Sequence, residues 1–336
     1  MRICVVCSPC IPCRVDLEYG GLEKVVALLA RELAKEHEVT LIAAKGSKVS
    51  KCELITPIEA RYSLPGENRE LELWAKAGVD ARDYDIVDFH THQRPAIRGD
   101  NIVWSIHDLL PPHPLYPYKL VARSKFHAAW LERQWGYEVT YCYNCIDVSE
   151  FKVKEKEDYF LFLSRICKGK GIFNLIEIAK RFPEQRFIIA GEDRIEYGIN
   201  PWELAKFLSK LPSNCEYLGY VSAREKQRLL SKAKALILPY DSNAYQEVFG
   251  LVVLEALASG TPVFALRNGA VPELIGLGKS LYGYVACSLE ELGKVLESYL
   301  EGKLQFDPWV LREYAASFSP SQAARRMLDI YSCLIL

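Results

Sequence analysis

Short apolar stretches alternate with amphipathic stretches along the whole chain of 336 residues. The apolar run at residues 2–7 is typical of a strand, and apolar positions recur close to a 3.6-residue period from Leu22 to Leu33. A helix between two strands returns the chain to the same end of the sheet, so strands that alternate with helices form parallel sheets. The sequence predicts an α/β fold built on parallel sheets.

A charged segment without periodicity, residues 151–158, separates two such alternations and is typical of a domain linker. The expected strands lie at 2–7, 38–43, 86–90, 102–105, 120–122 and 139–143 before this segment, and at 159–163, 186–190, 216–218, 235–238 and 263–265 after it. Ser319 is a typical cap for a last helix. We therefore predict two α/β domains, residues 1–151 and 152–317, followed by a helix in residues 318–336.

The charge balance excludes some partners. The net charge is -1, from 42 basic and 43 acidic residues, which argues against a dedicated nucleic-acid binder. No apolar run reaches the roughly 18 residues that a membrane-spanning helix needs. The first residues resemble a strand without a cleavable signal pattern. These features predict a cytoplasmic protein.

Four of the eleven cysteines, Cys4, Cys7, Cys10 and Cys13, follow one another at a three-residue spacing. This spacing is compatible with an iron–sulfur or zinc site, or with a buried strand and loop that carry free thiols or a local disulfide. Cys4 and Cys7 are an odd number of residues apart on a strand, so they should point to opposite faces of the sheet. We therefore expect no metal there.

Two carboxylates eight residues apart, Glu247 and Glu255, flank the start of an apolar helix. Glu255 lies among apolar residues, where an unpaired charge is costly, so we expect it to have a fixed partner. Between the carboxylates, Phe249, Gly250 and Leu251 would present backbone N–H groups at the helix N-terminus, which favours an anion. A phosphate beside a carboxylate that needs hydroxyl partners predicts a bound nucleotide sugar.

Two cations follow the expected strand at 159–163. Arg165 and Lys170 stand near Gly169 and Gly171, which would allow the backbone to approach a ligand closely. Arginine and lysine neutralise phosphate, so we expect this loop to bind phosphate, with a plain basic surface loop as the alternative.

The first half contains weaker candidates. Gly20 and Gly21 form a turn between a strand and a helix, where an anion can bind, although two glycines are also common in an ordinary turn. His107 follows a strand and can hydrogen-bond a sugar hydroxyl or an acceptor, with a packing role as the alternative. His90 and His92 have a spacing too ordinary to indicate a metal pair.

Together these residues resemble the retaining, GT-B fold glycosyltransferases of family four, also called group 1 glycosyltransferases. The resemblance is strongest over residues 159–275. The matching motifs are Arg165 with Lys170-Gly171, the Glu247…Glu255 pair with Phe249-Gly250 between, Gly260-Thr261-Pro262-Val263, Gly20-Gly21-Leu22-Glu23, and His107-Asp108. Ser164 departs from the family pattern, which has a glycine before the basic donor-binding residue.

The resemblance implies a GT-B fold of two Rossmann-like, doubly wound domains that face each other across a cleft. The C-terminal helix would return to the N-terminal, acceptor-side domain, and the second domain would bind the donor. The reaction would retain anomeric configuration and need no metal or other cofactor.

The resemblance also implies residue roles in catalysis. Arg165 and Lys170 would hold the donor diphosphate and stabilise the charge that develops on it. Glu247 would bind hydroxyls of the donor sugar. His107 would contact the transferred sugar or the acceptor.

The remaining implied roles concern donor binding. Glu255 would bind the ribose hydroxyls, and Gly20 and Gly21 would approach the phosphates from the opposite domain. The segment after Glu247 would bind the donor through its backbone, and it consists of Val248, Phe249, Gly250 and Leu251.

We therefore expect an enzyme that moves a hexose from a nucleotide sugar, UDP-hexose in preference to GDP-mannose, to an acceptor hydroxyl. The acceptor would be a glycan, a lipid-linked molecule or a small molecule. A sugar-nucleotide 2-epimerase of the same fold and a non-catalytic nucleotide-sugar or glycan binding protein are the alternatives.

One stretch raises the question of peripheral contact with the inner face of a membrane. Between residues 94 and 133, basic residues outnumber acidic ones, and aromatic residues lie nearby. The basic residues are Arg94, Arg98, Lys119, Arg123, Lys125 and Arg133, and the aromatic residues are Tyr116, Tyr118, Phe126, Trp130 and Trp135. Such a face is compatible with anionic lipid, although a solvated helix with aromatic core contacts is favoured.

Overall fold

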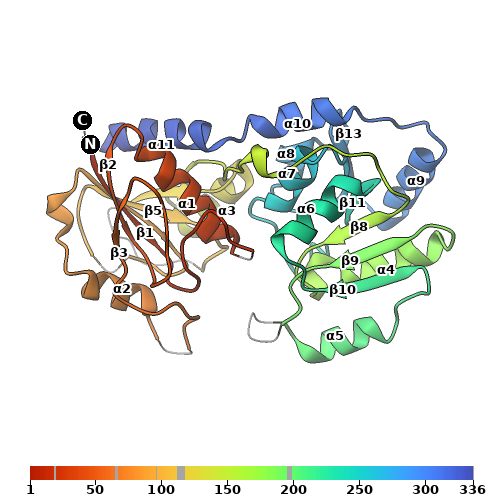
Figure 1. Cartoon of the computed structure of the whole chain (residues 1–336), viewed down its shortest axis with the longest axis horizontal. Helices are drawn as coiled ribbons and strands as arrows, with labels where there is room; N and C mark the ends of the chain where they lie inside the picture. Colours follow the sequence, from red (N-terminus) through yellow and green to blue (C-terminus); the bar gives the residue numbers. More distant parts are fainter. Residues whose placement is uncertain (19, 65–66, 96, 112–117, 195–198, 336) are drawn as a thin grey trace. The chain divides into compact units, whose positions relative to one another are not determined.

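The computed structural model describes residues 1–18, 20–64, 67–95, 97–111, 118–194 and 199–335. The chain divides into two compact units, shown in Figure 1. The first is Met1–Ile146 with Phe318–Leu336, and the second is Asp147–Ser317. The N-terminal part of the first unit therefore ends at Ile146, five residues before the predicted end of the first domain at residue 151. Residues 148–151 belong to the second unit because Arg312 of that unit donates hydrogen bonds to the carbonyl oxygens of Val148 and Phe151.

Within the described residues, the first unit contains a seven-stranded sheet in the order β3-β2-β1-β4-β5-β6-β7. Every neighbouring pair of its strands is parallel. The strands are β1 (Arg2–Cys7), β2 (Glu38–Ile42), β3 (Glu53–Ile55), β4 (Ile86–Thr91), β5 (Ile102–Ile106), β6 (Lys119–Ala122) and β7 (Thr140–Tyr141). The predicted α/β class with parallel sheets is confirmed.

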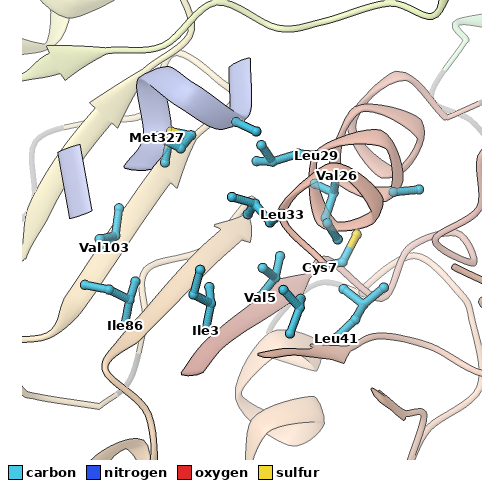
Figure 2. Close-up of a cluster of buried hydrophobic side chains, with 14 of the residues drawn as sticks. Ile3, Val5, Cys7, Val26, Leu29, Leu33, Leu41, Ile86, Val103 and Met327 are labelled. Carbon is cyan, nitrogen blue, oxygen red and sulfur yellow. The ribbon is translucent and has the colours of Figure 1, made fainter. Parts of the chain in front are cut away.

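Helices cover both faces of this sheet. They are α1 (Gly21–Leu33), α2 (Arg69–Ala77), α3 (Lys125–Trp135) and α11 (Pro320–Ile335), with a 3-10 turn η1 (Ala81–Asp83). Helices α1 and α11 share one apolar core with the sheet, and Figure 2 shows Leu29 and Met327 above strand residues of that core. Helices α2 and α3 pack on the opposite core. Cys4 belongs to the second core and Cys7 to the first, so the predicted opposite orientation of these two cysteines is confirmed.

The second unit repeats this plan, with the strand order β10-β9-β8-β11-β12-β14-β13. Pairing is parallel except between β13 and β14. The strands are β8 (Phe160–Leu163), β9 (Phe187–Ala190), β10 (Cys215–Gly219), β11 (Ala235–Leu238), β12 (Val263–Leu266), β13 (Gly278–Lys279) and β14 (Gly283–Ala286). The helices are α4 (Ile172–Arg181), α5 (Pro201–Leu208), α6 (Ala223–Lys232), α7 (Leu251–Ala258), α8 (Val271–Ile275), α9 (Leu289–Leu300) and α10 (Pro308–Ala316), with 3-10 turns η2 (Val148–Glu150) and η3 (Lys168–Lys170).

In both units the chain order of the strands reverses beside the first strand. The reversal lies between β1 and β4 in the first unit, and between β8 and β11 in the second. Open α/β sheets bind ligands outside the carboxyl ends of the strands at such a reversal. In the second unit this position is formed by the loops that follow β8 and β11.

Candidate active site

Two glycines let the loop after β8 pack against the loop after β11. A Cβ atom on Gly171, which has a φ of 89°, would lie 1.9 Å from the carbonyl oxygen of Pro239. A Cβ atom on Gly169 would lie 2.5 Å from Cβ of Tyr245. Larger residues would force the loops apart, so the glycines are what bring Lys170 to the β11 loop.

Lys170 and Glu247 form a buried ion pair at this position. Lys170 Nζ lies 2.5 Å from Glu247 Oε2, and the two side chains are 9% and 10% exposed. The Tyr245 hydroxyl donates to Glu247 Oε1 at 3.3 Å, and its ring centroid lies 4.0 Å from Lys170 Nζ. The predicted phosphate-binding lysine and sugar-binding carboxylate therefore lie in direct contact.

Both members of this pair are charged in the folded protein. Burial opposes the charge on Lys170, but the Glu247 carboxylate outweighs it and raises the pKa of Lys170 above its ordinary value. Burial likewise opposes the charge on Glu247, and Lys170 outweighs it, so the pKa of Glu247 is lowered.

Asn268, which follows β12, fixes the backbone of Glu247. Its Oδ1 accepts from Glu247 N at 2.6 Å, and its Nδ2 donates to Tyr245 O at 2.8 Å. Ala270 N donates to Glu247 O at 2.8 Å. Sequence reasoning missed Asn268, since a lone Asn after a strand is usually part of a turn.

Arg165 is exposed at the start of the β8 loop and lies close enough to add positive charge beside the ion pair, where it lowers the pKa of Glu247 further. Tyr240, in the loop two residues after β11, was also missed. Its buried hydroxyl has no hydrogen-bond partner among the described residues. Burial, followed by the nearby Glu247 carboxylate, raises the pKa of this hydroxyl well above the ordinary value. The site therefore combines two cations, a carboxylate and a buried hydroxyl.

Helix α7 begins at Leu251, so Glu247 stands just outside the helix start, as predicted. Its N-cap residue is Gly250, which has a φ of 99° and supplies no side-chain hydrogen bond to the first turn. Phe249 is buried and Val248 is half-buried. The helix N-terminus thus follows directly on the ion pair.

The partner of Glu255 is a protein side chain. Lys226 Nζ, on helix α6, donates to Glu255 Oε1 at 2.6 Å, and the Glu255 side chain is only partly buried. The predicted fixed partner of Glu255 is confirmed, but it is a cation on α6 that sequence reasoning missed. The inference that this carboxylate needs ligand hydroxyls as partners is therefore wrong. A ribose-binding role for Glu255 therefore rests on the resemblance alone.

In the first unit, Gly20 and Gly21 lie at the start of α1. Gly20 has a φ of 114°, and a Cβ atom there would lie 2.9 Å from Glu23 Oε2. The Glu23 side chain is buried, and its burial raises its pKa to about 7. The glycine turn thus covers the buried carboxyl group of Glu23, to which the sequence analysis assigned no role of its own.

His107 follows β5 and is buried rather than surface-exposed. Its Nε2 lies 3.0 Å from Nδ1 of His90. Burial, followed by the nearby Arg123 guanidinium, lowers the pKa of His107 well below its ordinary value, so its imidazole is neutral. The neighbouring His92 Nδ1 lies 2.5 Å from Asp108 Oδ2.

The structure also places the cysteines and the basic and aromatic stretch. All eleven cysteines are free thiols. Among the described residues, no group of three or more His, Cys, Asp or Glu side chains is placed to hold a metal ion. Arg123 and Trp135 of the basic and aromatic stretch are buried, and Tyr116 lies outside the described residues. No described helix is both long enough and apolar enough to cross a membrane.

Solved glycosyltransferases share this fold. AviGT4, a glycosyltransferase involved in avilamycin A biosynthesis, matches with a TM-score of 0.75 at 23% identity, over 99% of this chain and 98% of that chain. Anabaena Alr3699/HepE in complex with UDP-glucose matches with a TM-score of 0.70 at 17% identity, over 99% of this chain and 100% of that chain. Both likenesses indicate a GT-B fold.

A curated relative matches over part of its length. The O-antigen chain mannosyltransferase RfbU of Salmonella typhimurium is 32% identical over 144 residues, which cover 40% of this chain and 39% of RfbU. The next two curated relatives are matched over 30% and 20% of their own lengths. The chain therefore spans less than two fifths of the length of these relatives.

Family models match both units. The model described as Glycosyltransferase Family 4 matches residues 19–150, and the model described as Glycosyl transferases group 1 matches residues 147–317. The second match covers the same residues as the second unit, which carries the Lys170–Glu247 pair. The chain belongs to the group 1 glycosyl transferase family.

Proposed function

We propose that this protein is a retaining, metal-independent hexosyltransferase that uses a UDP-hexose donor and an acceptor hydroxyl. One observation carries the proposal. The buried Lys170–Glu247 pair, with Arg165 beside it, lies at the carboxyl ends of β8 and β11, where the strand order reverses. Cations for a diphosphate and a carboxylate for hydroxyls are the groups that a nucleotide sugar needs.

In the proposed reaction, the bond between the anomeric carbon of the hexose and the diphosphate oxygen breaks, and its electron pair leaves with UDP. The acceptor oxygen forms a bond to the same carbon on the same face, and its proton passes to the departing diphosphate. Arg165 and Lys170 stabilise the negative charge that develops on the diphosphate. The first turn of α7, after Gly250, assists through its N–H groups.

Glu247 orients the donor sugar in this proposal. Its backbone is held by Asn268 and Ala270, so its carboxylate occupies a fixed position next to Lys170. Without donor, the two side chains compensate each other. A bound diphosphate would supply negative charge to Lys170, and Glu247 would then accept hydrogen bonds from sugar hydroxyls.

The comparisons support the class of donor. Anabaena Alr3699/HepE has been solved with UDP-glucose, which favours a uridine nucleotide. RfbU is named a mannosyltransferase, so GDP-mannose is the second donor to test. The acceptor classes are a glycan, a lipid-linked molecule and a small molecule, with peripheral membrane contact as a related proposal.

A thermal-shift panel of UDP-glucose, UDP-galactose, GDP-mannose and ADP-glucose tests donor binding. A UDP-hexose is expected to raise the melting temperature most, because a ligand that binds only the native state stabilises it. The preferred donor is then incubated with an acceptor panel in EDTA, with and without added Mg²⁺ or Mn²⁺. Transfer with retained anomeric configuration, at a rate that these metals do not change, is expected.

Three results would overturn the proposal. They are no stabilisation by any nucleotide sugar, binding without turnover across the acceptor panel, and conversion of UDP-N-acetylglucosamine to its manno epimer without an acceptor. The second result indicates a binding protein, and the third indicates a 2-epimerase.

A further inference from the structure

A chain of buried hydrogen bonds joins the C-terminal helix to His107. The Tyr331 hydroxyl, on α11, donates to Asp88 Oδ2 at 2.6 Å. The same oxygen lies 3.1 Å from His90 Nε2. On the other side of the ring, His90 Nδ1 lies 3.0 Å from His107 Nε2.

The sheet places these residues in line. Asp88 and His90 are two residues apart on β4, so both point to the same face, and β5 pairs alongside β4 and leads into His107. Helix α11 covers this face, and Figure 2 shows Met327, one turn before Tyr331, on the same side of the sheet as the strand residues Ile86 and Val103. The contact from Tyr331 therefore depends on the docking of the C-terminal helix.

Asp88 is the charged acceptor in this chain. Burial opposes its charge, but the contacts with His90 and the hydrogen bond from Tyr331 outweigh burial and hold the pKa of Asp88 below its ordinary value. A carboxylate only accepts hydrogen bonds, so the proton between Asp88 and His90 is on His90 Nε2.

The tautomers of both histidines follow from this assignment. With one proton on its ring, His90 carries that proton on Nε2, so its Nδ1 has a lone pair and accepts. His107 must then donate from Nε2, which leaves a lone pair on its own Nδ1. Asp88, His90 and Tyr331 are 0% exposed and His107 is 9% exposed, so the chain reaches accessible surface at His107.

We propose that Asp88, His90 and Tyr331 are positioning residues that hold His107 in the Nε2–H tautomer, so that Nδ1 accepts a hydrogen bond from a substrate hydroxyl. This inference rests on the proposed function, in which His107 contacts the transferred sugar or the acceptor. The lowered pKa of His107 agrees with it, since a neutral imidazole keeps the acceptor lone pair.

The tautomers are measured directly on the unmodified protein by long-range ¹H–¹⁵N NMR of histidine-labelled samples. The signals of the two rings are assigned by their disappearance in His107→Gln and His90→Gln. Both rings are expected to carry hydrogen on Nε2 and none on Nδ1. A His107 ring with hydrogen on Nδ1, or a His90 ring with hydrogen on both nitrogens, would overturn the inference, because His90 would then donate to His107.

A matched pair of variants links the tautomer to catalysis. The amide of His90→Gln can donate to Asp88 and accept from His107, whereas His90→Leu keeps bulk but does neither. Transfer kcat is expected to fall about ten- to hundredfold in His90→Leu and to be largely retained in His90→Gln, with UDP affinity unchanged in both. Equal kcat values in the two variants would contradict the positioning role.

The two levels of inference fail in different ways. If the protein shows no transfer activity but both histidines are Nε2–H tautomers, the proposed function fails and the positioning network stands. If transfer occurs and His107 is the Nδ1–H tautomer, the network fails and the proposed function stands. The NMR measurement also decides the question if His90→Leu does not fold.

Discussion

At the scale of single residues, the Lys170–Glu247 pair is the strongest feature of the second unit. Each charge would be unfavourable alone in its buried position, and each is stabilised by the other. Removal of one member leaves the other buried without its partner, which costs about 3–5 kcal/mol. Loss of activity in such a variant therefore reports on function only when folding is measured alongside it.

Glu23 offers a cleaner test of residue-level electrostatics. Burial raises its pKa to about 7 in the folded protein, compared with about 4.3 for an ordinary Glu. The folded state binds this proton more tightly than the unfolded state does. The resulting stabilisation of the folded state is fully present below about pH 4.3 and is lost as the pH rises through about 7.

We therefore expect the melting temperature of the wild type to fall relative to that of Glu23→Gln between about pH 5 and about pH 8. Melting curves of both proteins across this range provide the measurement. Glu36→Gln, which changes an exposed carboxylate, should follow the wild type throughout. A constant difference between wild type and Glu23→Gln would show that Glu23 titrates normally.

At the scale of elements, the sequence predicted the strands and helices that have a clear pattern of apolar residues and missed elements that lack such a pattern. Most of the buried strands were predicted because they are apolar runs. The strands that were missed are β3 and β13, which are very short and partly exposed, and β14, which is mostly buried but begins with a glycine. Helix α6 was missed because its sequence is mostly polar, with Leu229 and Leu230 as its buried apolar residues. Missing α6 meant missing Lys226, the partner of Glu255.

The loop after β12 fixes Glu247 through close backbone contact, and this predicts a strong effect of a small substitution. A Cβ atom on Gly269 would lie 2.0 Å from Glu247 O. Gly269→Ala should displace Glu247 and lower transfer kcat by about a hundredfold, because misplaced catalytic groups lose their alignment with substrate. Steady-state kinetics and melting curves are measured together.

Gly302→Ala is the matched control for this substitution. Gly302 also has a positive φ, of 75°, but nothing lies within 4 Å of the Cβ position. It should lose about 1 kcal/mol of stability from backbone strain and keep its transfer rate. Equal kcat values for the two glycine variants would contradict the contact between Gly269 and Glu247.

At the scale of the whole molecule, long-range contacts decide which residues of each site meet. Tyr331 and Asp88 are 243 residues apart in sequence and in contact in the first unit. The pattern of Ser319 and Pro320 predicted the C-terminal helix, but no sequence pattern indicates which strand residue it contacts. Glu247 and Lys170 were predicted individually from motifs, whereas their ion pair and the supporting Asn268 depend on how the loops pack.

The central claim is that the loop after β8 holds the diphosphate of a nucleotide sugar, and calorimetric titration of UDP-hexose tests it most directly. Arg165 and Lys168 are both exposed cations in this loop, so they form a matched pair for substitution, and melting curves of both variants are measured alongside the titration. Arg165→Ala should weaken binding about ten- to hundredfold, as expected for loss of a charged hydrogen bond to phosphate, and Lys168→Ala should bind as the wild type does. Equal affinity of Arg165→Ala and wild type for the donor would contradict the claim.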